Sequence, residues 1–228
     1  MHVLNNVIRS DLFARMEIEL RHEIDGIFND ETSFPGIVRS INFSIVNPLL
    51  EAMRRDRSIV KEYGMDLFHP GDQVRGFASI LCSRGFIHGD YLGGMANAED
   101  VPPAAVFYFG FPQFYHHGRP RRRETGTAFF KEKHTGNGVT TAPSSRVEWS
   151  TCQDDLFEET LRLEGVANRL ILYPQHVFHN AWHDGTTRCE EEEEGSNNNI
   201  NLPCRAMDGR LAISLFFHSK GGKKIGQG

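Results

Sequence analysis

The stretch Gly209-Arg210-Leu211-Ala212-Ile213-Ser214-Leu215-Phe216-Phe217 has the composition of a buried β-strand that begins with one charged residue. Short apolar or alternating runs of the same kind recur after residue 71, separated by glycine, proline, asparagine and charged clusters. Many short strands separated in this way predict a β-sandwich or barrel. The other expected strands lie at 73–82, 85–91, 104–111, 126–131, 167–173 and 176–183.

The first 70 residues have a different pattern. Apolar residues recur every three or four positions over 10–29, which predicts a helix. A second helix is expected from Pro48 to about Tyr63, with Asn47 as its N-cap and Gly64 at its end. One further helix is predicted among the strands, at about 153–164.

One domain is expected over residues 1–228, because all-β folds of this length often form a single core. We divide it into a helical support layer (1–70) and a β-core (71–219). An acidic and asparagine-rich insertion loop at 189–204 lies within that core, and its centre has almost no apolar residue. The basic stretch 116–124 is expected to be a second loop.

Composition excludes several classes of protein. A net charge of -5 argues against a dedicated nucleic-acid binder. The four cysteines lack the paired spacing of a zinc site and are too few for a disulfide scaffold, so we expect free thiols in a reducing compartment. The segment before Arg9 is too short and polar for a signal peptide, and no apolar run is long enough to span a membrane. These features predict a cytoplasmic protein.

The run Ile87-His88-Gly89-Asp90 contains a possible pair of metal ligands. Alternate side chains of a strand share a face, so His88 and Asp90 would point the same way. A histidine from a neighbouring strand would complete two histidines and one carboxylate, which leave three positions open on an octahedral metal, as in non-haem Fe(II) oxygenases. Taken alone, the His-x-Asp triplet is better explained as a hydrogen-bonded pair at a strand end.

Three histidines are candidates for the third ligand. His179 lies in the most apolar part of its strand, where a metal would supply a partner for the imidazole. His183 precedes the turn at Asp184-Gly185, and His176 would face the other way in a regular strand. The alternative for His179 is a core histidine satisfied by hydrogen bonds.

A metal with open positions also needs a co-substrate. Arg210 and Ser214 share one face of their strand, and a guanidinium at the end of an apolar pocket can bind a carboxylate through two hydrogen bonds. A dicarboxylate such as 2-oxoglutarate would chelate iron at one end and reach Arg210 with the other. Arg188 is an alternative partner, and Arg210 can also be read as a surface residue.

In sequence order, these motifs resemble the Fe(II)/2-oxoglutarate-dependent oxygenase superfamily, on its prolyl-hydroxylase-like side, in a poorly characterised branch. The resemblance covers roughly residues 34–217. It is carried by Phe34-Pro35-Gly36-Ile37-Val38-Arg39-Ser40, Ile87-His88-Gly89-Asp90, Ala105-Val106-Phe107-Tyr108-Phe109, Gly126-Thr127-Ala128-Phe129-Phe130, Asn168-Arg169-Leu170-Ile171-Leu172-Tyr173, Phe178-His179-Asn180-Ala181 and Arg210-Leu211.

The resemblance implies a double-stranded β-helix, or jelly-roll, with the metal at one end. It makes His88, Asp90 and His179 the iron ligands at the catalytic centre and Arg210 the residue that binds the distal carboxylate of 2-oxoglutarate. The other co-substrate candidates are Tyr108, Thr127 and Ser214, and Arg39 is a candidate for a substrate carboxylate. Tyr108 can equally well be explained as an aromatic residue of the hydrophobic core. The chain departs from the pattern in its stretched gap between His179 and Arg210.

The implied activity is that of a dioxygenase that uses Fe(II), O2 and 2-oxoglutarate. It would oxidise, by default hydroxylate, a small-molecule or amino-acid-like substrate and release succinate and CO2. Two alternatives remain: a cupin-like metalloenzyme that does not use 2-oxoglutarate, and a non-catalytic binding protein. The sequence sets neither the substrate nor the oligomeric state.

Overall fold

The computed structural model describes residues 1–24, 36–64, 68, 74–81, 87–90, 101–110, 114–116, 119–121, 125–139, 155–183 and 210–218. Its helices are α1 (Ser10–Ile24), α2 (Phe43–Arg55) and α3 (Arg57–Tyr63). Its strands are β1 (His2–Asn5), β2 (Gly36–Ser40), β3 (Val74–Leu81), β4 (Pro103–Gly110), β5 (Phe114–His116), β6 (Arg119–Arg121), β7 (Thr125–Glu132), β8 (Phe157–Glu164), β9 (Arg169–Pro174), β10 (His179–His183) and β11 (Arg210–Phe217).

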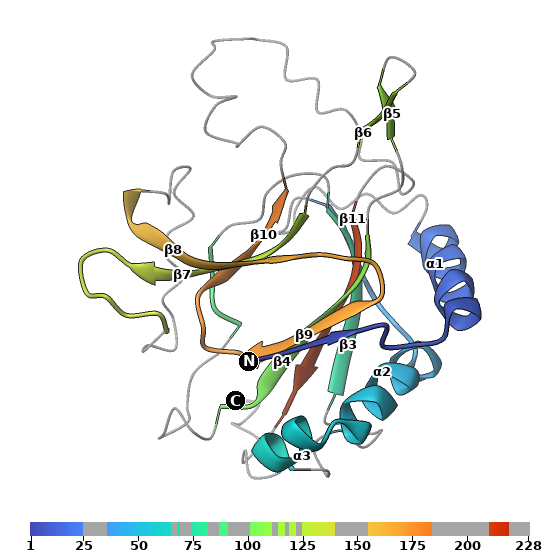
Figure 1. Cartoon of the computed structure of the whole chain (residues 1–228), viewed down its shortest axis with the longest axis horizontal. Helices are drawn as coiled ribbons and strands as arrows, with labels where there is room; N and C mark the ends of the chain where they lie inside the picture. The colour runs from blue at the N-terminus through green and yellow to red at the C-terminus, as the bar shows by residue number, and fades with distance from the viewer. Residues whose placement is uncertain are drawn as a thin grey trace, which may run out of the picture.

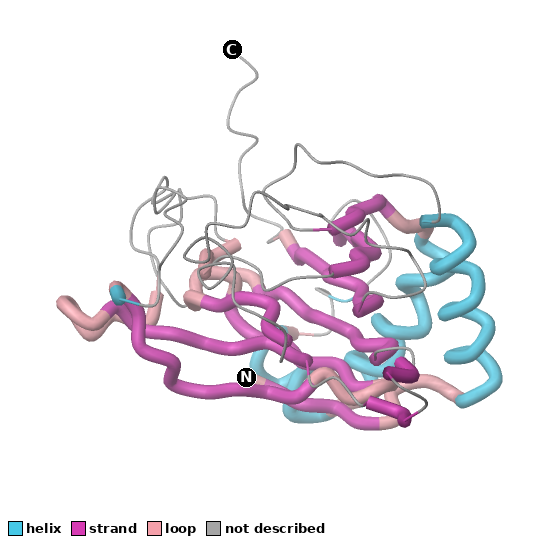
Figure 2. The backbone as a smooth tube through the Cα atoms, turned by 90° about the horizontal axis from the view of Figure 1, so that it is seen from above, coloured by secondary structure: helices cyan, strands magenta, loops and turns pink. Residues whose placement is uncertain are grey.

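Two antiparallel sheets form the body of the molecule (Figure 1). The larger sheet has the order β1-β9-β4-β11-β3-β2, and the smaller one has the order β10-β7-β8. Short strands β5 and β6 pair only with each other. The helices lie beside the larger sheet, on the side away from β7 and β8 (Figures 1 and 2). This arrangement confirms the predicted mainly β jelly-roll with N-terminal helices.

Each face of the larger sheet has its own core, because alternate side chains of a strand point to opposite faces. On β11, Leu211, Ile213 and their alternate neighbours pack with buried residues of the three helices. Ala212 faces the other way and packs with Tyr108 and with Phe129 of the smaller sheet. The face between the two sheets is the one on which Arg210 also lies, so it is the face that can build a site.

The second helix begins earlier than predicted. It starts at Phe43, so Pro48 lies inside α2 and the prediction of Asn47 as N-cap is wrong. The helix then breaks at Asp56, whose carboxylate accepts hydrogen bonds from the backbone N–H groups of Ser58 and Ile59 and so caps α3. The predicted end at Gly64 is confirmed; its φ of 78° is a conformation that favours glycine.

The helix predicted at 153–164 is wrong, because this segment contains β8. The strand pairs antiparallel with β7 from Gly126↔Glu164 to Glu132↔Phe157. The apolar spacing of Phe157, Leu161 and Leu163 fits both a helix and a strand, and tertiary pairing with β7 selects the strand. Most of β8 is exposed, as befits the edge of the smaller sheet.

Several strands were not predicted from the sequence. β1 and β2 lie in the first 70 residues but form the two edges of the larger sheet, and β6 lies in the stretch expected to be a basic loop. The division of the domain at residue 70 stays a prediction. The acidic loop at 189–204 and Arg188 lie outside the described residues. Within the described part of the chain, no helix is long and apolar enough to cross a membrane.

Candidate metal centre

The backbone brings His88 and His179 together. His88 N–H donates to the carbonyl of His179 at 2.9 Å, and His179 N–H donates to the carbonyl of His88 at 2.8 Å. Asp90 N–H donates to the carbonyl of Gln175 at 2.8 Å, in the turn that leads into β10. The segment at 87–90 is therefore fixed along the start of β10, and its side chains face His179.

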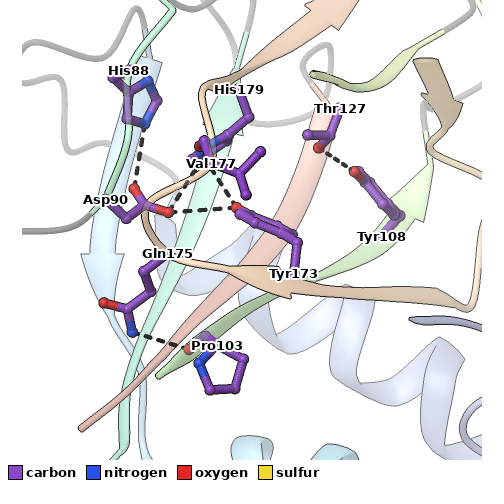
Figure 3. Close-up of polar contacts among 9 residues, drawn as sticks. All are labelled: His88, Asp90, Pro103, Tyr108, Thr127, Tyr173, Gln175, Val177 and His179. Carbon is purple, nitrogen blue, oxygen red and sulfur yellow. Dashed lines mark hydrogen bonds and ion pairs between the residues drawn. The ribbon is translucent and has the colours of Figure 1, made fainter. Parts of the chain in front are cut away.

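The side chains of His88, Asp90 and His179 converge on one point (Figure 3). One ligand atom from each lies within 4.8 Å of the other two. The two oxygens of Asp90 lie 3.4 Å from His88 Nε2 and 3.3 Å from His179 Nε2. Ligands at about 2 Å on one face of an octahedral ion lie about 3 Å from one another, so the three side chains are close enough to bind one metal ion.

A hydrogen bond at the far side of the imidazole ring fixes the tautomer of His179. Its Nδ1 lies 2.9 Å from the carbonyl oxygen of Val177. A carbonyl can only accept, so Nδ1 carries a hydrogen, which leaves Nε2, on the side of Asp90, as the nitrogen that can bind a metal. Metal-binding histidines are generally oriented in this way.

Charge and burial act in opposite directions on Asp90, whose side chain is 8% exposed. Burial alone would raise the pKa of the carboxyl, but the charge of His179 and hydrogen bonds with His179 and His88 outweigh it and lower the pKa of Asp90 below its usual value. Asp90 is therefore ionised at neutral pH, the form that binds a metal.

Tyr173 also contacts this cluster, although it was not among the residues predicted for the site. Its hydroxyl lies 3.1 Å from His179 Nε2 and 3.5 Å from Asp90 Oδ2 (Figure 3). Burial, together with the negative charge of Asp90, raises the pKa of the Tyr173 phenol well above its usual value. The hydroxyl is therefore a protonated hydrogen-bond donor at the centre.

Arg210 is buried on the face between the two sheets, with 4% of the residue exposed. Its Nη1 donates to the carbonyl of Gly126 at 2.6 Å, and its guanidinium carbon lies 5.2 Å from the ring centroid of Tyr108. In the part of the chain that the structure describes, its buried Nε has no hydrogen-bond partner. Among the residues that the structure describes, no carboxylate pairs with Arg210. A buried charge without a counter-charge is costly, so this side chain suits an anionic ligand.

Hydroxyl groups lie on the same face near Arg210. The Tyr108 hydroxyl and Thr127 Oγ1 are buried and hydrogen-bonded at 2.5 Å (Figure 3). Burial raises the pKa of Tyr108. Burial lowers the pKa of Arg210, and the nearby phenols of Tyr108 and Tyr173 oppose that shift. Tyr173 thus lies close to both the His-Asp cluster and the arginine.

The structure assigns no contact with the cluster or with Arg210 to the remaining candidates, as far as their residues are described. Ser214 shares the inner-face parity of Arg210 and pairs with Val106 and Phe77 on the flanking strands. Arg39 lies on β2 opposite Ala78, and its side chain lies outside the description, as does Arg188. The roles proposed for Ser214 and Arg39 therefore stay predictions.

Of the two other histidines considered as ligands, His176 is not part of the cluster, and the side chain of His183 lies outside the described residues. His183 lies at the opposite end of β10 from His179, where its backbone pairs with Thr125. His176 lies in the turn between β9 and β10, and burial lowers its pKa.

No family model matches the chain, and no curated protein matches it. Among solved structures, the chain is similar to a prolyl-4-hydroxylase from Pseudomonas putida, with a TM-score of 0.51 and 13% identity over 96% of this chain and 92% of that one. It is also similar to OsALKBH1, with a TM-score of 0.50 and 8% identity over 94% and 96% of the two chains.

A third similar structure is the epimerase SnoN in complex with Fe3+, alpha ketoglutarate and nogalamycin RO. Its TM-score is 0.50, and its identity is 10% over 99% of this chain and 86% of that one. At these identities the similarity concerns the fold. The fold of this chain is that of the Fe(II)/2-oxoglutarate-dependent oxygenases, and for the fold the resemblance found in the sequence is confirmed.

Proposed function

We propose that the protein is an Fe(II)- and 2-oxoglutarate-dependent dioxygenase that hydroxylates a small-molecule substrate and releases succinate and CO2. One observation carries the proposal. The cluster of His88, Asp90 and His179 lies on the same inner region as a buried arginine that has no carboxylate partner among the described residues. A metal site and an anion site on one inner face of the sheet fit a co-substrate that has a carboxylate at each end.

The donor set of the cluster fits Fe(II). Two imidazole nitrogens and one carboxylate oxygen form the facial set that leaves positions open on the metal. The ionised Asp90 and the oriented Nε2 of His179 are the ligand forms that such an ion needs. Bound there, Fe(II) would supply coordination sites for the co-substrate and dioxygen and would activate the dioxygen, which is the oxidant of the reaction.

The protein's own contribution would be binding, orientation and exclusion of water. Arg210 would pair with the distal carboxylate, and its unpartnered Nε offers a donor for that purpose. The buried hydroxyls of Tyr108 and Thr127 lie on the same face as further polar groups. Phe129 packs against Tyr173 with ring centroids 5.3 Å apart, so aromatic rings lie beside the cluster and would help to exclude bulk water.

The test is anaerobic reconstitution with Fe(II) and 2-oxoglutarate, followed by exposure to oxygen and a succinate assay with a pooled library of small molecules. The unsubstituted protein should form succinate even without a matching substrate, through uncoupled turnover. If it binds no stoichiometric iron and forms no succinate, the proposal is wrong. Products formed from the library would identify hydroxylation.

The variant Arg210→Ala tests the co-substrate site. Removing one partner of a buried charge pair costs roughly 2 kcal/mol or more, so KM for 2-oxoglutarate should rise about 30-fold or more. Metal affinity should persist, since Arg210 donates to Gly126 rather than to the cluster. The exposed Arg9, paired with Asp11, is the matched control, and Arg9→Ala should leave KM unchanged. Succinate formation that is equal in Arg210→Ala and the unsubstituted protein would exclude this role for Arg210.

A further inference from the structure

We propose that Tyr173 is a positioning residue of the metal centre: its hydroxyl holds one oxygen of Asp90, so that only the other oxygen is left for the metal. This inference rests on the proposed metal centre and assigns a role to a residue outside the ligand set. The hydroxyl lies 3.5 Å from Asp90 Oδ2 and 3.1 Å from His179 Nε2, and Tyr173 is 2% exposed.

A tyrosine hydroxyl has a single hydrogen to donate, and two acceptors lie within its reach. One is His179 Nε2, which is the acceptor nitrogen of the neutral ring because Nδ1 donates to Val177. The other is Asp90 Oδ2. A metal ion bound to the cluster takes the lone pair of Nε2, which leaves Asp90 Oδ2 as the acceptor for Tyr173. The hydrogen bond therefore moves to the carboxylate when the metal binds.

The two oxygens of Asp90 have different neighbours. Oδ1 faces His88 Nε2 at 3.4 Å, whereas Oδ2 lies near both His179 and the Tyr173 hydroxyl. A hydrogen bond to an ionised oxygen is stronger than one to a neutral nitrogen. The metal-bound state therefore gains more from Tyr173 than the metal-free state does, and Tyr173 should increase metal affinity.

The surroundings of Tyr173 hold its hydroxyl in this position. Its ring packs against Phe129 and lies 4.8 Å, centroid to centroid, from the ring of His179. Two residues farther along the chain, the Gln175 side chain donates to the carbonyls of Pro103 and Phe217, at 3.0 and 2.8 Å. The carbonyl of Gln175 accepts from Asp90 N–H. The end of β9 thus fixes both the backbone and one carboxylate oxygen of Asp90 (Figure 3).

The experiment is a titration of the full chain with Co(II), followed by its visible absorption, for the unsubstituted protein, Tyr173→Phe and the control Tyr63→Phe. Loss of a partner behind a metal ligand typically weakens metal binding about 10- to 100-fold, which is the change expected for Tyr173→Phe. The Co(II) spectrum should also change, because Asp90 becomes free to bind through both oxygens. Tyr63→Phe also removes a tyrosine hydroxyl, but on α3, in the core on the other face of the larger sheet, so it should leave both measurements unchanged.

Infrared spectra of the unsubstituted protein provide a second measurement that needs no variant. The separation of the carboxylate stretches in the metal-loaded minus metal-free difference spectrum should be that of a carboxylate bound through one oxygen. A separation typical of two-oxygen binding would overturn the proposal. An unchanged metal affinity and an unchanged spectrum in Tyr173→Phe would also overturn it. A phenolate-to-Fe(III) absorption band that disappears in Tyr173→Phe would overturn it too, because Tyr173 would then be a metal ligand.

The failure of the metal centre itself has a different signature. If the unsubstituted protein binds no Co(II), or if Asp90→Asn binds it equally well, the proposed function fails, and the role of Tyr173 fails with it. If the unsubstituted protein binds Co(II) and Asp90→Asn does not, the comparison with Tyr173→Phe decides the role of Tyr173 alone.

Discussion

Gly126 lies where the proposed co-substrate site meets the smaller sheet. Its carbonyl accepts the hydrogen bond from Arg210, and its Cα lies against β8. A Cβ added at this position would lie 1.8 Å from the carbonyl oxygen of Leu163 and 2.9 Å from Trp182 Nε1. Because the nearest atom belongs to the backbone, a side chain cannot fit without moving β8 away from β7.

The substitution Gly126→Ala should therefore destabilise the protein by about 3 kcal/mol, at the upper end of the usual cost of overpacking. It should also weaken 2-oxoglutarate binding, because the carbonyl that holds Arg210 would move. Urea denaturation and a 2-oxoglutarate titration measure the two effects. Gly138→Ala is the control, since a Cβ there meets only the Phe130 carbonyl at 3.6 Å. A stability equal to that of the control would contradict the packing argument.

At the scale of elements, the break between α2 and α3 depends on Asp56. Its carboxylate accepts a hydrogen bond from the Ser58 hydroxyl and from two backbone N–H groups of the first turn of α3. The hydrogen bond from Ser58, followed by that from the Ile59 backbone, lowers the pKa of Asp56 below its usual value. A carboxyl with a lowered pKa in the folded state stabilises the fold above the unfolded pKa, and the effect disappears as the pH falls through the folded pKa.

Asp56→Ala should lower the free energy of unfolding by about 1 kcal/mol at neutral pH, the usual loss for an N-cap. The difference from the unsubstituted protein should narrow below about pH 4, where the carboxyl protonates. Denaturant unfolding of the metal-free protein at both pH values provides the measurement. Asp11→Ala removes a carboxylate that forms an exposed ion pair with Arg9, and it should change the free energy of unfolding only slightly. A difference that stays constant with pH would exclude the charged cap as its origin.

For the whole molecule, the proposed metal joins segments that are far apart in sequence. His88 and Asp90 follow β3, whereas His179 begins β10 on the smaller sheet. In the described structure these segments meet through the His88–His179 backbone bridge and the hydrogen bond of Asp90 N–H to Gln175. An ion bound to all three side chains would add a further connection that exists only in the folded state.

Metal binding should accordingly raise thermal stability. Co(II) at about 100 times its Kd should add about 2.7 kcal/mol, which corresponds to a rise in Tm of roughly 5 to 10 °C. Asp90→Asn should abolish the rise, because it removes the charged ligand. Glu158→Gln, which changes an exposed ion pair with Lys131, should retain the rise in Tm. Differential scanning calorimetry with and without Co(II) measures the rise in Tm. An equal rise in Tm for Asp90→Asn would mean that the ion binds elsewhere.

The sequence predicts the sheets well where strands are buried and end at turn residues, as in β4 and β11. It predicts edge strands poorly. β1 and β2 are short, and β8 carries an apolar spacing that also fits a helix, so the partner strand decides the conformation.

The same contrast applies to the site. The His-x-Asp spacing and the apolar setting of His179 identify three side chains that the fold brings together. Tyr173 gives no comparable signal, because a tyrosine in an apolar strand is typical of a core. Its contact with Asp90 depends on how the end of β9 lies against residues 87–90, which is a tertiary relation.

The exposed edge formed by β8 has a consequence for contacts between molecules. A free strand edge can recruit a strand from a second chain and start aggregation. Half of the residues of β8 are charged: Glu158, Glu159, Arg162 and Glu164. Two of them form a local ion pair at 2.6 Å, and Glu158 pairs with Lys131 on the neighbouring strand. A second chain adding here would have to desolvate this row of charges, so β8 opposes growth of the sheet into fibrils.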